Sequence, residues 1–357
     1  MKRLILHIGV ENTASTYLQQ TFANSRDALR DAGVLYPHAP GTTNHFKLAA
    51  LAMDDARDDE IRIMAGIRSP EDAVALRASF LEELVREASE SGCGTVLFSN
   101  EHCASRLIQE QDIRRLKEML TPLAKTTTVV VYLRRQDEAV LSMYSTALRS
   151  GSSRPLQFPA VQAIEWKLDY QMLLDQWAAV FGRQNIVVRL FDQPHNGSIL
   201  EDFVIAASLP GEISWSKPDT RLNKRLDARQ AEYLRMLNAY FPEFQAENVS
   251  TRRGDLSQVV SQVEGSSTPL ALPPGMAEEI LERMRASNRA VALEYFGREL
   301  PGDPLFGQVD IPSADAPYAM TFEEFAKMTA EIWSVKNQQQ QYLVRRLREG
   351  RKKRNER

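Results

Sequence analysis

Residues 4–19, Leu-Ile-Leu-His-Ile-Gly-Val-Glu-Asn-Thr-Ala-Ser-Thr-Tyr-Leu-Gln, decide how this 357-residue chain is interpreted. An apolar run typical of a buried strand leads through a short polar turn into a helical pattern. The small residues Ala14 and Ser15 let backbone N–H groups approach an anion, and the start of a helix favours phosphate or sulfate. Thr13, Ser15 and Thr16 add hydroxyl groups at the same place. The junction therefore predicts an anion site.

The same junction does not match the Walker pattern G-x-x-x-x-G-K-[ST] of ATP-binding loops. Gly9 is followed five positions later by Ala14, and Ser15 stands where the lysine belongs. An ordinary ATP site is therefore disfavoured. A simpler alternative also stays open, because Thr13 and Ser15 are common helix-capping residues and such turns can bind nothing.

A second strand-to-helix junction follows the apolar run 127–133. Arg134 comes directly after this run, and its guanidinium group suits two-point contact with a phosphate. Ser142 follows eight residues later in a helical pattern, a spacing that returns a side chain to nearly the same face. The pattern predicts a second phosphate contact. The alternative is that Arg134 and Arg135 cap a sheet edge and that Ser142 only packs.

Together the two junctions resemble the sulfotransferases that use 3′-phosphoadenosine-5′-phosphosulfate (PAPS). The first loop of that family reads approximately G-x-x-K-T-G-T-T-x-L, and residues 9–18 match it in position, with Asn12 replacing the lysine and Ala14 the glycine. Arg134 and Ser142 match the family's 3′-phosphate motif. The resemblance implies PAPS as cosubstrate. The residues implied to hold it are Asn12, Thr13, Ala14, Ser15, Thr16, Arg134, Ser142, Lys224 and Arg225.

The resemblance extends over most of the chain with weaker motifs that mainly support the fold and the order of its elements. These motifs are residues 24–37, 96–102, 186–191 with Asp202-Phe203, 223–225 and 287–289.

Apolar runs typical of strands alternate with helical patterns along the first half of the chain. The expected strands are 4–8, 95–99, 128–133 and 186–191. This alternation predicts an α/β fold with three layers, in which a P-loop-like parallel sheet is flanked by helices. In such sheets ligands bind outside the carboxyl ends of the strands, where the residues named above lie. We expect a sulfotransferase-like domain over 1–250, a loop-rich and helical part of it over 251–320, and a helical C-terminal extension with a basic tail over 321–357.

Composition excludes several classes of function. The chain is 43% hydrophobic and carries a net charge of −3, which gives no general attraction to nucleic acid. No run is long and apolar enough for a transmembrane segment, and no secretory signal is found, so we expect a cytoplasmic protein. Cys93 and Cys103 lie in no metal-ligand spacing, so no metal is expected. The basic stretch 345–357 is interpreted as a solvated helix end, with contact to an anionic surface as the alternative.

If the cosubstrate is PAPS, the reaction transfers a sulfuryl group to a hydroxyl or amine of a carbohydrate, lipid or small-molecule acceptor. A base must take the acceptor's proton. Glu101 and His102, directly after the second expected strand, are the leading candidates, and His45 is the alternative. Each of the three can equally be a hydrogen-bonded structural residue.

Asn12 raises a difficulty, because an amide carries no charge where the family's lysine stabilises the leaving oxygen. Either the amide suffices, or Arg135, Lys224 or Arg225 supplies the charge, or the protein binds nucleotide without efficient transfer. The last outcome defines the main alternative, a catalytically impaired nucleotide-binding or scaffold protein. A nucleotide-dependent kinase or a glycosyltransferase is a further alternative, disfavoured by the missing Walker lysine and by the lack of a D-x-D motif after a strand.

Overall fold

The computed structural model describes residues 3–157, 161–218, 226–241, 254–263, 265, 268–308 and 318–346, with backbone alone for 244–245, 248–249 and 347–355. Contacts divide the chain into two compact units. The first contains residues 1–139, 163–220 and 281–309, and the second contains 140–162, 221–280 and 310–357. The expected divisions at residues 250 and 320 stay a prediction.

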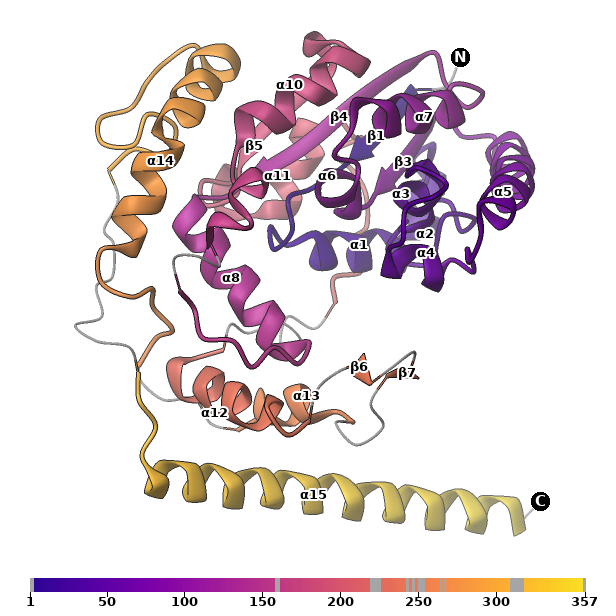
Figure 1. Ribbon diagram of the computed structural model, residues 1–357. Helices are drawn as coiled ribbons and strands as arrows, with labels where there is room; N and C mark the ends of the chain where they lie inside the picture. The colour runs from indigo at the N-terminus through magenta and orange to yellow at the C-terminus, as the bar shows by residue number, and fades with distance from the viewer. Residues whose placement is uncertain are drawn as a thin grey trace. The chain divides into compact units, whose positions relative to one another are not determined.

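A five-stranded, all-parallel sheet forms the centre of the first unit, with the order β2-β3-β1-β4-β5 (Figure 1). The strands are β1 (Arg3–His7), β2 (Val34–Leu35), β3 (Thr95–Ser99), β4 (Thr126–Leu133) and β5 (Ile186–Leu190). Four of them are those expected from the sequence. The two-residue edge strand β2 was not expected, because so short an apolar run shows no periodicity.

Both faces of this sheet are buried. Leu4 and Leu6 of β1 join one hydrophobic core, whereas Ile5 between them joins the other, as the alternation of side chains along a strand requires. Strands covered on both sides are apolar at nearly every position, which explains the continuous apolar runs in the sequence. The predicted three-layer α/β fold is therefore confirmed.

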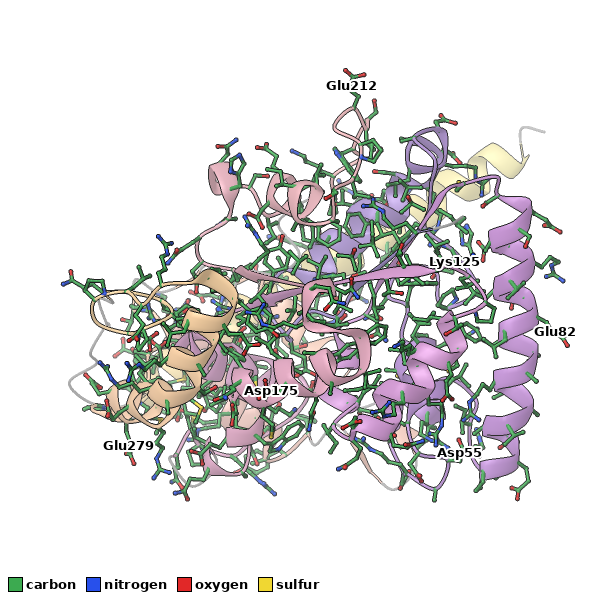
Figure 2. All side chains as sticks on the ribbon, turned by 90° about the horizontal axis from the view of Figure 1, so that it is seen from above. Asp55, Glu82, Lys125, Asp175, Glu212 and Glu279 are labelled. Atoms are coloured by element: carbon green, nitrogen blue, oxygen red, sulfur yellow. The ribbon has the colours of Figure 1, made fainter. Side chains whose placement is uncertain are left out.

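Helices cover the two faces unequally. Three helices pack on the core that contains Ile5: α1 (Ser15–Asn24), α2 (Arg26–Asp31) and α11 (Ile199–Ala206). The core that contains Leu4 and Leu6 is covered by α3 (Lys47–Ala52), α5 (Pro70–Glu90), α7 (Glu110–Leu120) and α10 (Tyr170–Phe181), and Ile61, Cys103 and Val291 of three further helices also join it. Figure 2 shows Glu82 of α5 projecting outward, while Phe80 and Leu84 of the same helix are buried.

Two short helices complete the part of the first unit that matters below: α4 (Glu60–Met64) and α6 (His102–Arg106). A third short element, the 3-10 turn η1 (Glu165–Lys167), comes before α10 in the chain. Two longer helices, α8 (Gln136–Arg149) and α14 (Met276–Val291), each begin in one unit and end in the other.

The second unit is mainly helical, with α12 (Ala228–Asn238), α13 (Leu256–Val260), α15 (Phe322–Asn355) and a small antiparallel pair, β6 (Phe244–Gln245) and β7 (Asn248–Val249). Leu234, Val260 and Met328 share its core. The long α15 matches the expected helical C-terminal extension. Among the described residues, no helix is both long and apolar enough to cross a membrane.

Candidate functional site

The loop between β1 and α1 has an unusual backbone. Gly9, Asn12 and Ala14 all have positive φ angles, of 46°, 69° and 59°. For a residue with a side chain this conformation costs about 1–2 kcal/mol, and it persists only where the surroundings impose it. Asparagine tolerates it better than alanine. Ala14 therefore marks a loop whose shape is imposed by the surrounding structure.

Gly9 lies where three functional side chains come together. A Cβ atom added to it would lie 2.9 Å from Ser15 Oγ, 3.4 Å from Glu101 Cβ and 3.5 Å from His7 Nε2. Both the positive φ and this close approach require glycine at the position. The start of the loop is therefore packed between a hydroxyl, an imidazole and the residue expected to act as a base.

Helix α1 begins without a side-chain cap. Its N-cap residue is Ala14, and no acidic residue lies in its first turn. Thr13 instead donates its hydroxyl to the Val10 carbonyl at 2.6 Å, and Ser15 Oγ is buried without a partner among the described residues. Thr16 is exposed. The simpler interpretation, in which Thr13 and Ser15 cap the helix, is therefore wrong, and the helix start is left to favour an anion.

Arg134 connects the two predicted junctions. Its NH1 donates to the Asn12 carbonyl at 3.0 Å, and its NH2 contacts Glu138 Oε2 at 3.1 Å. The guanidinium carbon lies 5.1 Å from the centre of the Phe191 ring, and Tyr170 donates its hydroxyl to the Arg134 carbonyl. The arginine after β4 and the loop after β1 are thus in direct contact within the first unit.

The other predicted cofactor residues are less closely placed. Arg135 binds Asp137 through two hydrogen bonds of 2.6 and 2.7 Å, so its guanidinium group is already engaged. Ser142 is half-buried on α8, in the part of that helix that belongs to the second unit. Lys224 and Arg225 lie outside the described residues. Their roles stay predictions.

Glu101 is held at the exit of β3 by two amides that the sequence analysis did not single out. Gln19 Nε2 and Asn44 Nδ2 both donate to Glu101 Oε2, at 2.6 and 2.9 Å. No donor in the described part of the chain contacts Oε1, so Glu101 stays a candidate base. Gln19 could have been found, because it lies four residues after Ser15 and so on the same face of α1.

His102 is the first residue of α6, and its backbone N–H donates to Asn100 Oδ1 at 3.0 Å. The ring is half-buried, and Nδ1 has no hydrogen-bond partner within the described ranges. This nitrogen is buried and unpaired in the described part of the chain, so His102 stays a candidate base.

His45 is placed differently, and the structure contradicts its expected role as a base. The backbone N–H of Ser99 donates to His45 Nδ1 at 3.3 Å, so Nε2 carries the proton and donates to the Pro37 carbonyl at 3.0 Å. Both nitrogens are engaged, the ring is fully buried, and this burial lowers the pKa of His45 to about 3. His45 links the end of β3 to the segment at Pro37 rather than accepting a substrate proton.

His7 forms the floor under the first loop. Its Nδ1 lies 2.8 Å from Ser99 Oγ, and its Nε2 is buried with no partner in the described residues. Complete burial lowers the pKa of His7 to about 3, so the ring is neutral at physiological pH. The floor of the loop therefore adds a polar group but no charge.

Two cations beside the first loop were missed. Arg106 NH1 lies 3.5 Å from Glu11 Oε1, and Lys167 Nζ lies 4.0 Å from Glu11 Oε2. Glu11 directly precedes Asn12, so both cations pair with the residue next in sequence to the position where the resemblance expects a lysine. Neither belongs to a motif or follows a strand, so no sequence signal pointed to them.

No cluster of histidine, cysteine or acidic side chains suited to a metal ion is found among the described residues. Cys93 and Cys103 are both buried thiols.

The crystal structure of a sulfotransferase from Alicyclobacillus acidocaldarius is similar to this chain, with a TM-score of 0.45 at 12% sequence identity. The similarity covers 83% of this chain and 96% of that chain. No protein-family model matches the sequence, and no curated protein matches it.

Proposed function

We propose that this protein is a sulfotransferase that uses PAPS to sulfate a hydroxyl or amine of a carbohydrate, lipid or small-molecule acceptor. One observation carries the proposal: the hydrogen bond from Arg134 to the Asn12 carbonyl. It joins a guanidinium group suited to one phosphate to an uncapped helix start suited to another. A nucleotide with phosphate groups at two separate positions fits this pair.

The residues of the first loop are chemically suited to a phosphate or sulfate group. Ser15 presents a buried hydroxyl with no protein partner in the described residues, and Gly9 leaves room where a Cβ would collide with it. Thr13, Ala14 and Thr16 are proposed to contribute to the same cradle through backbone or hydroxyl groups. PAPS would supply the activated sulfuryl group, while these groups bind and orient its anionic end.

Glu101 and His102 are proposed to take the acceptor's proton. The amides of Gln19 and Asn44 fix one oxygen of Glu101, which leaves the other oriented toward a substrate. His102 offers Nδ1 at the same end of α6. A base within hydrogen-bond reach of the acceptor is what general base catalysis requires.

A second candidate function is nucleotide binding without efficient transfer, and the neutral Asn12 favours it. Arg135, one of the cations expected to compensate, is engaged with Asp137. A kinase stays disfavoured, because Ser15 occupies the position of the Walker lysine. A glycosyltransferase stays disfavoured, because the sequence has no D-x-D motif after a strand.

The first test is calorimetric titration of the purified protein with adenosine 3′,5′-bisphosphate, ATP and a nucleotide sugar. We expect the bisphosphate to bind most tightly and the Arg134→Ala variant to lose most of that affinity. Arg114→Ala is the matched control, because Arg114 forms only an exposed pair with Glu110 on α7. Tighter binding of ATP or the nucleotide sugar would overturn the proposal.

The second test follows transfer of labelled sulfate from PAPS to a panel of hydroxylated acceptors. Transfer by the wild-type protein supports the enzyme. Nucleotide binding without transfer, together with transfer by Asn12→Lys, would instead support the catalytically impaired binder.

A further inference from the structure

A hollow of about 330 Å³ lies beside the first loop within the first unit. Its walls come from the start of α4, the end of α6 and the turn η1. The side chains that matter are Arg57, Asp59, Glu60, Arg106, Trp166 and Lys167. This volume is in the range of small-molecule sites and is large enough for a single six-membered ring with its substituents.

The hollow adjoins the proposed reaction centre at two points. Glu11, which pairs with Arg106 and Lys167, directly precedes Asn12 in the first loop. Helix α6 begins at His102 and ends at Arg106, a rise of about 6 Å along its axis. The hollow therefore lies at the end of the short helix whose first residue is the candidate base His102.

The charges around the hollow balance. Three cations line the hollow, Arg57, Arg106 and Lys167, together with the carboxylates of Asp59 and Glu60. Glu11 is not part of the lining, but it adds the third negative charge through its pairs with Arg106 and Lys167. The ion pairs that Arg106 makes with these carboxylates measure 3.4 to 3.5 Å, and the other two pairs measure 3.5 and 4.0 Å. Strong charge-assisted hydrogen bonds are shorter, at about 2.7–2.9 Å. The charged groups are thus only loosely paired with one another, although Arg57 NH1 donates to the Arg106 carbonyl at 2.6 Å and Asp59 Oδ1 accepts from the Ile61 N–H at 3.1 Å.

Trp166 adds an apolar surface to this polar wall. Its side chain is 38% exposed, which is unusual for the largest apolar residue. Lys167 Nζ lies 5.4 Å from the centre of its ring. An amphipathic ring of this kind pairs well with a ligand that has one apolar face and a polar edge.

We propose that this hollow is the acceptor subsite and that it takes an uncharged polyhydroxylated ring, that is, a neutral sugar. The proposal rests on the proposed function, since it names the acceptor for the same reaction. Hydroxyl groups can donate to the carboxylates and accept from the guanidinium groups at once, while the C–H face of the sugar packs on Trp166. An anionic ring would meet Asp59 and Glu60, and a cationic ring would meet Arg57 and Arg106, so either charge is disfavoured.

The test compares three methyl glycosides that share one ring: glucoside, glucuronide and protonated glucosaminide, with net charges of 0, −1 and +1. Binding is measured by NMR titration with and without adenosine 3′,5′-bisphosphate, so no transfer is needed. We expect the neutral glucoside to bind best, and Trp166→Ala to weaken it by about tenfold, the upper range for one aromatic contact. Trp166→Phe should keep most of the affinity and controls for folding.

Trp333→Ala is the matched control, because Trp333 is an exposed tryptophan on α15 in the second unit. It should leave glycoside binding unchanged. Tighter binding of either charged glycoside, or equal binding by Trp166→Ala and the wild type, would overturn the subsite. Failure of the protein to bind the bisphosphate, with glycoside binding retained, would overturn the proposed function and leave the subsite standing.

Discussion

The loop after β1 and the turn after β4 are joined by the hydrogen bond from Arg134 to the Asn12 carbonyl, yet their chemical groups differ. The loop offers backbone N–H groups, hydroxyls and the neutral imidazole of His7, with no cation of its own. The turn carries Arg134 and Arg135 with the carboxylates of Asp137 and Glu138. The difference suggests that affinity for the nucleotide depends mainly on the charged turn, whereas the rate of transfer depends on the uncharged loop.

The largest expected effect is a loss of stability at low pH, and it comes from the buried neutral histidines at and near the first loop. The pKa values of His7 and His45 are lowered from 6.5 to about 3 by burial. Between pH 7 and pH 5 the unfolded chain takes up protons that the folded protein excludes, so stability falls as the pH falls. We expect a loss of about 2 kcal/mol for each histidine over this interval, measured by urea unfolding at both pH values.

Two variants sharpen this prediction. His7→Gln should remove about half of the pH dependence, whatever its effect on overall stability. His195→Gln is the control, because His195 is exposed and should leave the slope unchanged. A wild-type protein that is equally stable at pH 7 and pH 5 would contradict the conclusion that His7 and His45 are buried in the neutral form.

The next effect tests the charged side. Arg134→Ala should weaken binding of adenosine 3′,5′-bisphosphate by about a hundredfold, since contacts to a charged group contribute about 1.5–3 kcal/mol. The affinity of Arg134→Lys should lie between those of the wild type and Arg134→Ala, because lysine keeps the positive charge but lacks the planar guanidinium group. Calorimetry measures all three, and an unchanged affinity in Arg134→Ala would remove the turn from the site.

A smaller effect is expected at Asn12, where the loop lacks a charge. Asn12→Lys should raise the rate of sulfuryl transfer by about tenfold, since ionised donors are roughly twice as strong as neutral ones. Nucleotide affinity should change less than the rate. A higher transfer rate with unchanged nucleotide affinity would support a loop that sets the rate and a turn that sets the affinity. Equal changes in rate and affinity would contradict that division between the loop and the turn. Lysine tolerates the positive φ of this position less well than asparagine, so unfolding is measured in parallel.

The smallest effect concerns the backbone of the loop. Ala14→Gly should stabilise the protein by about 0.5–1 kcal/mol, because relief of the positive φ exceeds the entropy that glycine adds to the unfolded chain. The free energy of urea unfolding measures this. Ala207→Gly is a suitable control, because Ala207 has ordinary negative φ and should be destabilised by the same substitution.

Much of the fold was predictable because it depends on local patterns. Continuous apolar runs identified four of the five strands, and their alternation with helical segments identified a sheet covered on both faces. The two-residue strand β2 and the short helices α3 and α4 escaped notice. Elements of two to six residues have too few positions for a period to be visible.

The candidate site was predictable only where chemistry follows a strand directly. The contact between Arg134 and the first loop, and the placement of Glu101 and His102, follow from three strands, β1, β3 and β4, that end at the same edge of the sheet. His45 was misjudged because its sequence neighbourhood does not reveal that Ser99 and Pro37 occupy both of its nitrogens.

By itself the sequence determined the layered sheet and its strand ends and predicted an anion site in the first loop, because each depends on residues close together in the chain. Only the tertiary structure decided which histidines are buried and neutral, which amides bind Glu101, and that Arg106 and Lys167 pair with Glu11, the residue before Asn12. Those relations join residues separated by tens to more than a hundred positions, and such contacts are selected by packing of the whole core rather than by any local preference.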